Sequence, residues 1–298
     1  MKILITGGSG LIGSNLLSML EGNEITVLTR NTTQSKAKLG DVHHYLSTLE
    51  ALNNLDEFDV VINLAGEPIV AKRWSEDQKR EIENSRWLVT EKLVQLIQSG
   101  KKPPHLFISG SAIGFYGKQD DHAIDEEFIA VHDEFSHRLC AKWESIAKQA
   151  ESEKTRVCIL RTGFVVSKKG GALSKMRLPF KMGLGGPISH GQQYISWIHI
   201  DDMLQGILHL IGNSGCHGVY NFTSPVPVTN NEFSREFAHS LNRPCLFRVP
   251  SFVIRSLMGE MSTLLLDGQR VVPKRLQESG YTFLHPELRG AFLSLIKP

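Results

Sequence analysis

In the first thirty residues, a short apolar run is followed by several glycines, then by apolar residues at helical spacing, and then by a second apolar run. Lys2 to Thr6 has the length of a strand, and Leu16, Leu17 and Leu20 recur at the spacing of one helix face. Glu24 to Thr29 is a second apolar run of strand length. The pattern therefore predicts strand, glycine turn, helix and strand.

The alternation continues to about residue 163. Further strands and helices are expected at 59–64, 75–97, 105–108, 136–150 and 156–160. Ser75, followed three residues later by Gln78, is typical of a capping box at a helix start. Strands that are apolar on both faces and alternate with helices favour a covered parallel sheet. We expect an α/β fold of the Rossmann type, with a doubly wound parallel sheet.

After Gly163 the regular alternation of strands and helices gives way to glycine-rich segments and less regularly spaced elements, which indicates a smaller lobe. Residues 168–172 and 183–187 are predicted as glycine-rich loops, 194–200 as a strand and 201–211 as a helix. We assign residues 1–166 to the NADP-binding Rossmann domain and expect 194–222 to return to it. Residues 167–193 and 223–298 then form a partly discontinuous C-terminal substrate lobe.

Composition narrows the class of partner. The chain has 298 residues, 41% hydrophobic and 21% charged, with a formal net charge of +2. This is ordinary for a soluble globular protein, and the cations form no stripe suited to a phosphate backbone. Early glycines interrupt the one segment resembling a secretory signal, and no run has the length of a membrane span. The sequence predicts a cytoplasmic protein with a small-molecule substrate and neither nucleic acid nor membrane as partner.

The first glycines carry the clearest chemistry. Gly7, Gly10 and Gly13 fit G-x-x-G-x-x-G between a strand and a helix, and Leu11 and Ile12 open that helix. Without side chains, the backbone amides approach a pyrophosphate, and the helix N-terminus adds positive potential. The alternative interpretation is a glycine-rich turn that binds nothing.

The residues at the end of the second strand help to distinguish NAD from NADP. They are Thr29 and Arg30, with no acidic residue that could bind a ribose 2′-hydroxyl. The Arg30 guanidinium can pair with a 2′-phosphate, so the cofactor expected is NADP(H). A solvated surface arginine is the alternative.

Several longer segments follow the glycine motif. They read NLAGEPI at 63–69, SRW at 85–87, SGSAIGFYG at 109–117, KWE at 142–144, RTGFVV at 161–166, WIHIDD at 197–202 and GQRVVPKRL at 268–276. Together they resemble the atypical short-chain dehydrogenase/reductases related to nucleoside-diphosphate-sugar epimerases, with a C-terminal domain of their own. The resemblance extends over nearly the whole chain.

The resemblance implies further cofactor contacts beyond the glycine motif. It places Leu64, Ala65 and Gly66 at the adenine-side edge of the cofactor, and Glu81 and Arg86 near it on the long helix. It places Ser109, Thr162, Gly163 and Val165 towards the nicotinamide end. For the strand-end residues, ordinary core packing is the alternative.

The superfamily's usual chemistry uses Y-x-x-x-K, in which the lysine lowers the tyrosine pKa. Here Lys142 matches the lysine, but Arg138 stands four residues earlier, and Ser111 matches the assisting serine. Replacement proton carriers beside the motifs are Tyr116, His137, His199 and Glu67. Tyr116 joins Ser111 and Lys142 as a catalytic candidate, although each replacement also has a structural interpretation.

Other chemistries are disfavoured. There is no H-E-x-x-H, paired cysteine or carboxylate cluster, and His43 with His44 reads as an exposed pair, so no metal is expected. A nucleophile elbow is absent as well. Many relatives in the family that the chain resembles pair through a long helix like the one at 75–97, so the resemblance also implies a possible homodimer.

Two hypotheses remain open on the sequence. The first is an NADP(H)-dependent oxidoreductase or epimerase acting on a small polar molecule, with nucleotide-linked substrates among the candidates. The second is a redox-silent NADP(H)-binding sensor or scaffold that has lost the catalytic tyrosine.

Overall fold

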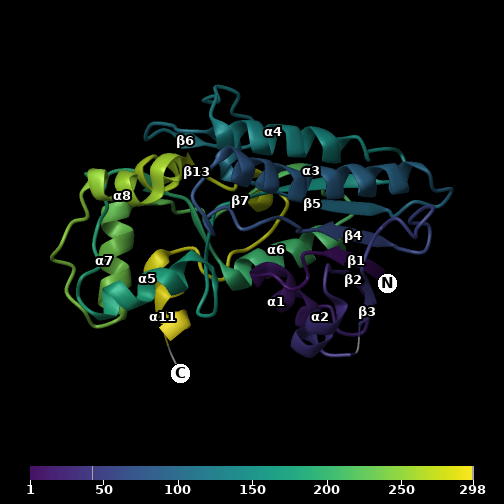
Figure 1. The fold of residues 1–298 in the computed structure, drawn as a ribbon, viewed down its shortest axis with the longest axis horizontal. Helices are drawn as coiled ribbons and strands as arrows, with labels where there is room; N and C mark the ends of the chain where they lie inside the picture. The colour runs from purple at the N-terminus through teal and green to yellow at the C-terminus, as the bar shows by residue number, and fades with distance from the viewer. Residues whose placement is uncertain (42, 297–298) are drawn as a thin grey trace.

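A seven-stranded sheet with all neighbours parallel forms the centre of the molecule (Figure 1). The computed structural model describes residues 1–41 and 43–296. In spatial order the strands are β11 (Gly218–Phe222), β7 (Arg156–Thr162), β5 (Leu106–Ala112), β4 (Val60–Asn63), β1 (Lys2–Thr6), β2 (Glu24–Leu28) and β3 (His44–Leu46). The predicted Rossmann-type fold is confirmed. Strand order reverses between β1 and β4, where such sheets bind ligands beyond their carboxyl ends.

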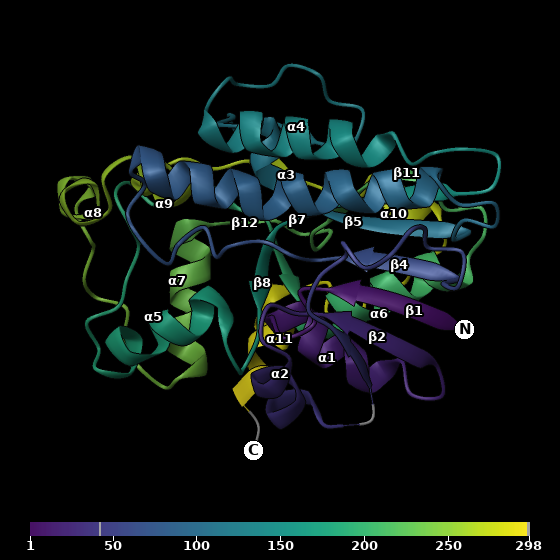
Figure 2. The same cartoon turned by 45° about the vertical axis from the view of Figure 1, so that its right-hand side comes forward.

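Helices cover both faces of this sheet, as Figures 1 and 2 show. Long helices α3 (Glu76–Gln98) and α4 (Phe135–Lys148) lie on one face, and α1 (Leu11–Met19) and α6 (Ile200–Gly212) on the other. Alternation within β1 produces this arrangement: Ile3 and Ile5 pack towards α1 and α6, while Leu4 packs towards α3 and α4. Shorter helices on the same domain are α2 (Thr32–Leu39) and α10 (Lys274–Glu278).

The second lobe has its own apolar core. The rings of Phe233 and Phe237 each lie 5.2 Å, centroid to centroid, from the ring of Phe292, and Trp197 belongs to the same cluster. Its helices are α5 (Gly171–Lys181), α7 (Asn230–Ser240), α8 (Ser251–Met258), α9 (Thr263–Leu266) and α11 (Leu288–Ile296), with 3-10 turns at Ile113–Tyr116 and Gly259–Ser262.

Three small sheets connect the lobe to the central domain. β8 (Phe164–Val166) pairs in parallel with β10 (Trp197–His199), β9 (Tyr194–Ile195) pairs with β12 (Val228–Thr229), and β6 (Ala123–Ile124) pairs with β13 (Arg270–Val271). The predicted single strand over 194–200 is therefore wrong. It is two short strands outside the central sheet, whereas α6 packs on that sheet and β11 extends its edge.

The prediction of a loop over 168–172 is also wrong for its last two residues. Helix α5 begins at Gly171, directly after Gly170, and both glycines have positive φ. Their left-handed backbone turns the chain into the helix, so glycines that suggested a continuing loop instead initiate a helix. None of the helices among the described residues has the length and apolarity needed to cross a membrane.

Buried polar contacts fix the carboxyl ends of β1 and β4 against the long helices. Thr6 Oγ1 donates to Asn63 Oδ1 at 2.6 Å, and Asn63 Nδ2 donates to Thr90 Oγ1 at 2.8 Å. Trp143 Nε1 on α4 donates to the same Thr90 oxygen at 2.9 Å. Because buried polar groups are costly when unpaired, this chain of bonds sets how α3 and α4 sit on the strands.

Candidate functional site

The glycine loop after β1 has no room for side chains. Gly7 has φ +70°, and a Cβ there would lie 2.4 Å from the Leu64 carbonyl oxygen. A Cβ on Gly13 would lie 2.4 Å from the Gly7 carbonyl oxygen. Glycine at these positions lets the loop fold tightly between β1, β4 and α1, which leaves a backbone-lined cradle at the switch point.

The same cradle has the electrostatics of an anion site. Helix α1 begins after Gly10, and its first turn, which includes Leu11 and Ile12, holds no acidic residue. The amides of a helix N-terminus have no partners within the helix, and together they favour negative charge. The free amides at the start of α1 are suited to an anionic group such as the pyrophosphate of a dinucleotide.

Arg30 follows β2 on the surface beside the start of α2. Its side chain is exposed, and no described carboxylate or carbonyl engages its guanidinium. Thr29 Oγ1 lies 2.7 Å from Ser35 Oγ, and Asn31 caps α2 by accepting from Gln34 N at 2.9 Å. The guanidinium therefore stands beside a second helix N-terminus, where an anionic group is stabilised by both.

The segment after β4 is held by α3. Ala65 N donates to Thr6 Oγ1 at 3.1 Å, and the Arg86 guanidinium donates to the Glu67 carbonyl at 3.0 Å. A Cβ on Gly66 would lie 2.9 Å from Arg86 Cζ. Arg86 thus clamps the Leu64 to Gly66 turn, and its guanidinium donates mainly to the backbone carbonyls of Ile82 and Glu67. Burial lowers its pKa.

Other residues expected near the cofactor occupy different settings. Glu81 is exposed on α3, and Ser109 is fully buried in β5. Thr162 ends β7, and a Cβ on Gly163 would lie 2.3 Å from the Ser196 carbonyl oxygen. Because Gly163 has no side chain, the backbone can pass close to the Ser196 carbonyl. The chain then continues into β8, which contains Val165.

A buried ion pair occupies the carboxyl end of β5 and β7. Arg161 Nε and Nη2 donate to the two carboxylate oxygens of Glu144 at 2.7 and 2.8 Å. Glu144 is 1% exposed and Arg161 is 3% exposed. Ser111 Oγ donates to the same carboxylate at 2.8 Å. Two parallel hydrogen bonds of this kind are strong and fix both side chains in one orientation.

Tyr116 joins this network from the 3-10 turn after β5. Arg161 Nη1 donates to its hydroxyl at 3.0 Å, and the hydroxyl lies 2.8 Å from the accepting Asn221 Oδ1 on β11. The ring is fully buried, and burial raises the pKa of Tyr116 to about 12. At neutral pH the phenol is a fixed donor within the protein.

The comparisons with known proteins decide the family. Residues 3–222 match the model of the NAD dependent epimerase/dehydratase family, and residues 249–295 match a domain of unknown function, DUF1731. The chain belongs to the NAD-dependent epimerase/dehydratase family.

Individual relatives match along their whole length. An epimerase family protein of Staphylococcus saprophyticus is 38% identical over 296 residues, which cover 98% of each chain. The crystal structure of human epimerase family protein SDR39U1 with NADPH aligns with a TM-score of 0.91 at 32% identity, covering 99% of each chain. A Bacillus cereus UDP-glucuronic acid 4-epimerase shares the fold at 17% identity, with a TM-score of 0.78 and 99% coverage of both chains.

Within this epimerase-family chain, Lys142 does not occupy the predicted place beside Ser111. It is exposed on α4, with its ammonium 4.0 Å from the centroid of the Trp87 ring. Arg138, one turn earlier on the same outer face, pairs with Asp133 at 2.9 Å. Positions 138 and 142 therefore lie on the outer face of α4, and a catalytic role for Lys142 stays a prediction that this placement disfavours.

The inward face of α4 carries Ser136 and Cys140, one turn apart, and then Glu144. The Cys140 thiol interacts with Ser111, and burial raises its pKa to about 11, so it is neutral at pH 7. These two residues take the inward position where the sequence had suggested Arg138 and Lys142. The signal that could have found them is Glu144, since the face containing it includes 136 and 140 at helical spacing.

The four replacement proton carriers differ in how they are engaged. Tyr116 is locked as described, His137 Nδ1 bonds the Phe115 carbonyl, and His199 Nδ1 accepts from Asp201 N at 3.1 Å. Glu67 follows β4 half-buried, and no described residue forms a hydrogen bond or ion pair with its carboxylate. Of the four, Glu67 has the ionisable group that is available at the strand ends.

Substituting Gly13 by alanine tests the cradle. The added methyl meets the Gly7 carbonyl and also Gly8 Cα at 2.7 Å, so the loop must move. We expect nicotinamide dinucleotide binding, measured by fluorescence of the reduced form, to weaken by about tenfold or more. Gly212→Ala is the matched control, because nothing lies within 4 Å of its added Cβ. Equal affinity in the two variants would place the dinucleotide elsewhere.

The buried ion pair predicts a large loss of stability on Glu144→Gln. Arg161 would keep its charge without a counter-charge, and we expect the free energy of unfolding to fall by about 3–5 kcal/mol. Urea unfolding followed by circular dichroism measures it. Asp133→Asn, which breaks the exposed pair with Arg138, should cost less than about 1 kcal/mol. Similar losses of unfolding free energy in both variants would show that the buried pair stabilises the fold no more than the exposed pair does.

Proposed function

We propose that this chain is an NADP(H)-dependent oxidoreductase or epimerase acting on a small polar molecule. The observation that carries the proposal is the glycine cradle at the β1/β4 switch point, with the unengaged Arg30 at the end of β2. Family membership supports the nicotinamide cofactor, and the human relative solved with NADPH supports its phosphorylated form.

The residues divide the work of holding a dinucleotide. The backbone of Gly7 to Gly13 and the start of α1 hold the pyrophosphate. Arg30 pairs with the 2′-phosphate, and the turn at 64–66, clamped by Arg86, borders the adenine side. When bound, the cofactor supplies reversible hydride transfer at its nicotinamide ring.

Proton transfer must then come from a group other than a tyrosine and lysine pair. Ser111 Oγ lies at the end of β5, and its hydrogen bond to Glu144 orients the hydroxyl oxygen as an acceptor for a substrate hydroxyl. Glu67 follows the neighbouring strand β4; its carboxylate forms no hydrogen bond or ion pair with a described residue and interacts electrostatically with Arg86. We infer that Ser111 positions the substrate and that Glu67 is the titratable group that exchanges its proton.

Charge in the second lobe favours an anionic substrate such as a nucleotide-linked one. Helix α5 carries Lys175, which is exposed, and Arg177, which is half-buried. No described carboxylate pairs with either. Cations that face no internal partner attract phosphate groups, as Arg and Lys do in many nucleotide sites.

The second hypothesis is a redox-silent NADP(H)-binding sensor or scaffold. The locked hydroxyl of Tyr116 favours it, because that network uses the strand-end polar groups for internal bonds. The two hypotheses differ in turnover. The silent protein binds NADPH and oxidises none of it with any carbonyl or sugar-nucleotide substrate.

Arg30→Ala tests the cofactor choice. We expect the unaltered chain to bind NADPH more tightly than NADH, and the variant to lose that preference by about tenfold or more, since a charge-assisted pair to phosphate is removed. Fluorescence titration with both dinucleotides measures it. Arg80→Ala, a surface arginine on α3, is the control. A preference that survives Arg30→Ala would contradict the assignment.

Glu67→Gln tests the proton carrier. We expect NADPH turnover with a substrate from a carbonyl and sugar-nucleotide panel to fall by about 100-fold or more, with the NADPH dissociation constant unchanged. The glutamine keeps the shape and removes the titrating group. Glu76→Gln, at an exposed position near the start of α3, should change neither the turnover nor the NADPH dissociation constant. Full activity in Glu67→Gln would move the role to another group.

A further inference from the structure

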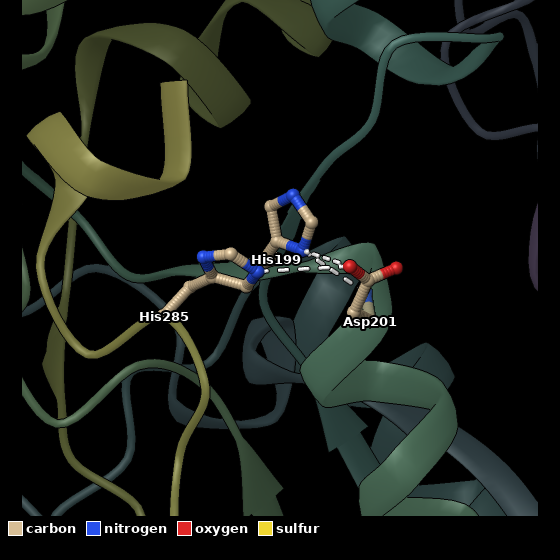
Figure 3. Close-up of side chains that lie close together, drawn as sticks. All are labelled: His199, Asp201 and His285. Atoms are coloured by element: carbon tan, nitrogen blue, oxygen red, sulfur yellow. Dashed lines mark hydrogen bonds and ion pairs between the residues drawn. The ribbon is translucent and has the colours of Figure 1, made fainter. Parts of the chain in front are cut away.

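Two histidines and an aspartate from distant parts of the chain meet where the second lobe joins α6 (Figure 3). His199 is the last residue of β10, and Asp201 lies in the first turn of α6. His285 comes from the segment that leads into α11. One ligand atom from each lies within 4.8 Å of the other two.

Two of the three ligand separations are close to those around a single tetrahedral ion. His199 Nδ1 lies 3.5 Å from Asp201 Oδ2, and His285 Nε2 lies 3.6 Å from the same oxygen. Ligand atoms bound at zinc distances in a tetrahedron are separated by about 3.3 Å. We propose that His199, Asp201 and His285 form a zinc-binding site, with a solvent molecule as fourth ligand.

The chemistry of the donors selects the ion. Two imidazole nitrogens and one carboxylate suit Zn²⁺ and related transition metals, whereas Ca²⁺ and Mg²⁺ require oxygen ligands. The Asp201 side chain is 55% exposed, so an ion reaches the site from solvent. His199 is buried beside it, and its ring centroid lies 3.9 Å from that of His285.

Surrounding contacts hold the ligands in place. The fully buried Asp202 accepts from the amides of Leu284 at 2.7 Å and His285 at 2.9 Å. Ser294 Oγ on α11 lies 3.2 Å from His199 Nε2, the ring nitrogen that faces away from Asp201. Such outer contacts fix ring orientation at metal sites and improve affinity.

Metal binding exchanges one existing bond for a stronger one. His199 Nδ1 now accepts from Asp201 N, and coordination would use the same lone pair. The ion would tie the segment before α11 to the start of α6, and so fasten the second lobe to the central domain.

Zinc titration of the full chain tests the site. Protein without a histidine tag, stripped by a chelator, is titrated with Zn²⁺ alone in a calorimeter, and its Tm is measured with and without Zn²⁺. We expect one equivalent to bind and the Tm to rise. His285→Ala and Asp201→Asn should each weaken this binding by at least about tenfold, because each removes a ligand. Co²⁺ in place of Zn²⁺ should give the intense visible absorption of a tetrahedral site.

The control removes a different histidine. His44→Ala breaks the adjacent pair at 43 and 44 and should leave zinc binding unchanged. Asp201→Asn preserves shape, so it keeps the test valid if His285→Ala fails to fold. Zinc binding of equal strength in the unaltered chain, His285→Ala and Asp201→Asn would overturn the proposal, as would the absence of stoichiometric binding.

Discussion

The buried ion pair between Glu144 and Arg161 is the constraint on which the strand ends depend. Two charges that are almost fully removed from water must satisfy each other, and one partner alone would be strongly destabilising. Their hydrogen bonds extend to Ser111, Tyr116 and Asn221, which joins β5, β7, β11 and α4 in one arrangement. The side chains at this edge of the sheet are consequently fixed before any ligand arrives.

This constraint separates cofactor binding from proton transfer. The glycine cradle lies between β1 and β4 and needs only backbone geometry, so it is independent of the ion pair. Tyr116, by contrast, has its hydroxyl held between Arg161 and Asn221, with a pKa of about 12. A chain of the epimerase/dehydratase family can in this way keep its dinucleotide site while its acid–base chemistry passes to another group, for which we propose Glu67.

Local patterns predicted the parts of the molecule that local physics determines. The short apolar runs of the early strands, the glycines before α1 and the capping of α3 by Ser75 all act within a few residues. Other expectations differ from the structure for separate reasons. Lys142 was aligned by sequence spacing, whereas the structure places it on the outer face of α4. The loop predicted over 168–172 gives way to α5, because Gly170 and Gly171 initiate that helix. The approach of His285 to Asp201 depends on tertiary packing, for which the sequence holds no local signal.

A crystal structure of the chain with NADPH would test the account most directly. We expect the pyrophosphate to lie against the backbone of Gly7 to Gly13 and the start of α1, with the 2′-phosphate at Arg30. We also expect the Tyr116 hydroxyl to keep its contacts with Arg161 and Asn221. A complex in which Tyr116 turns to the nicotinamide, or in which the dinucleotide lies away from the glycine loop, would contradict it.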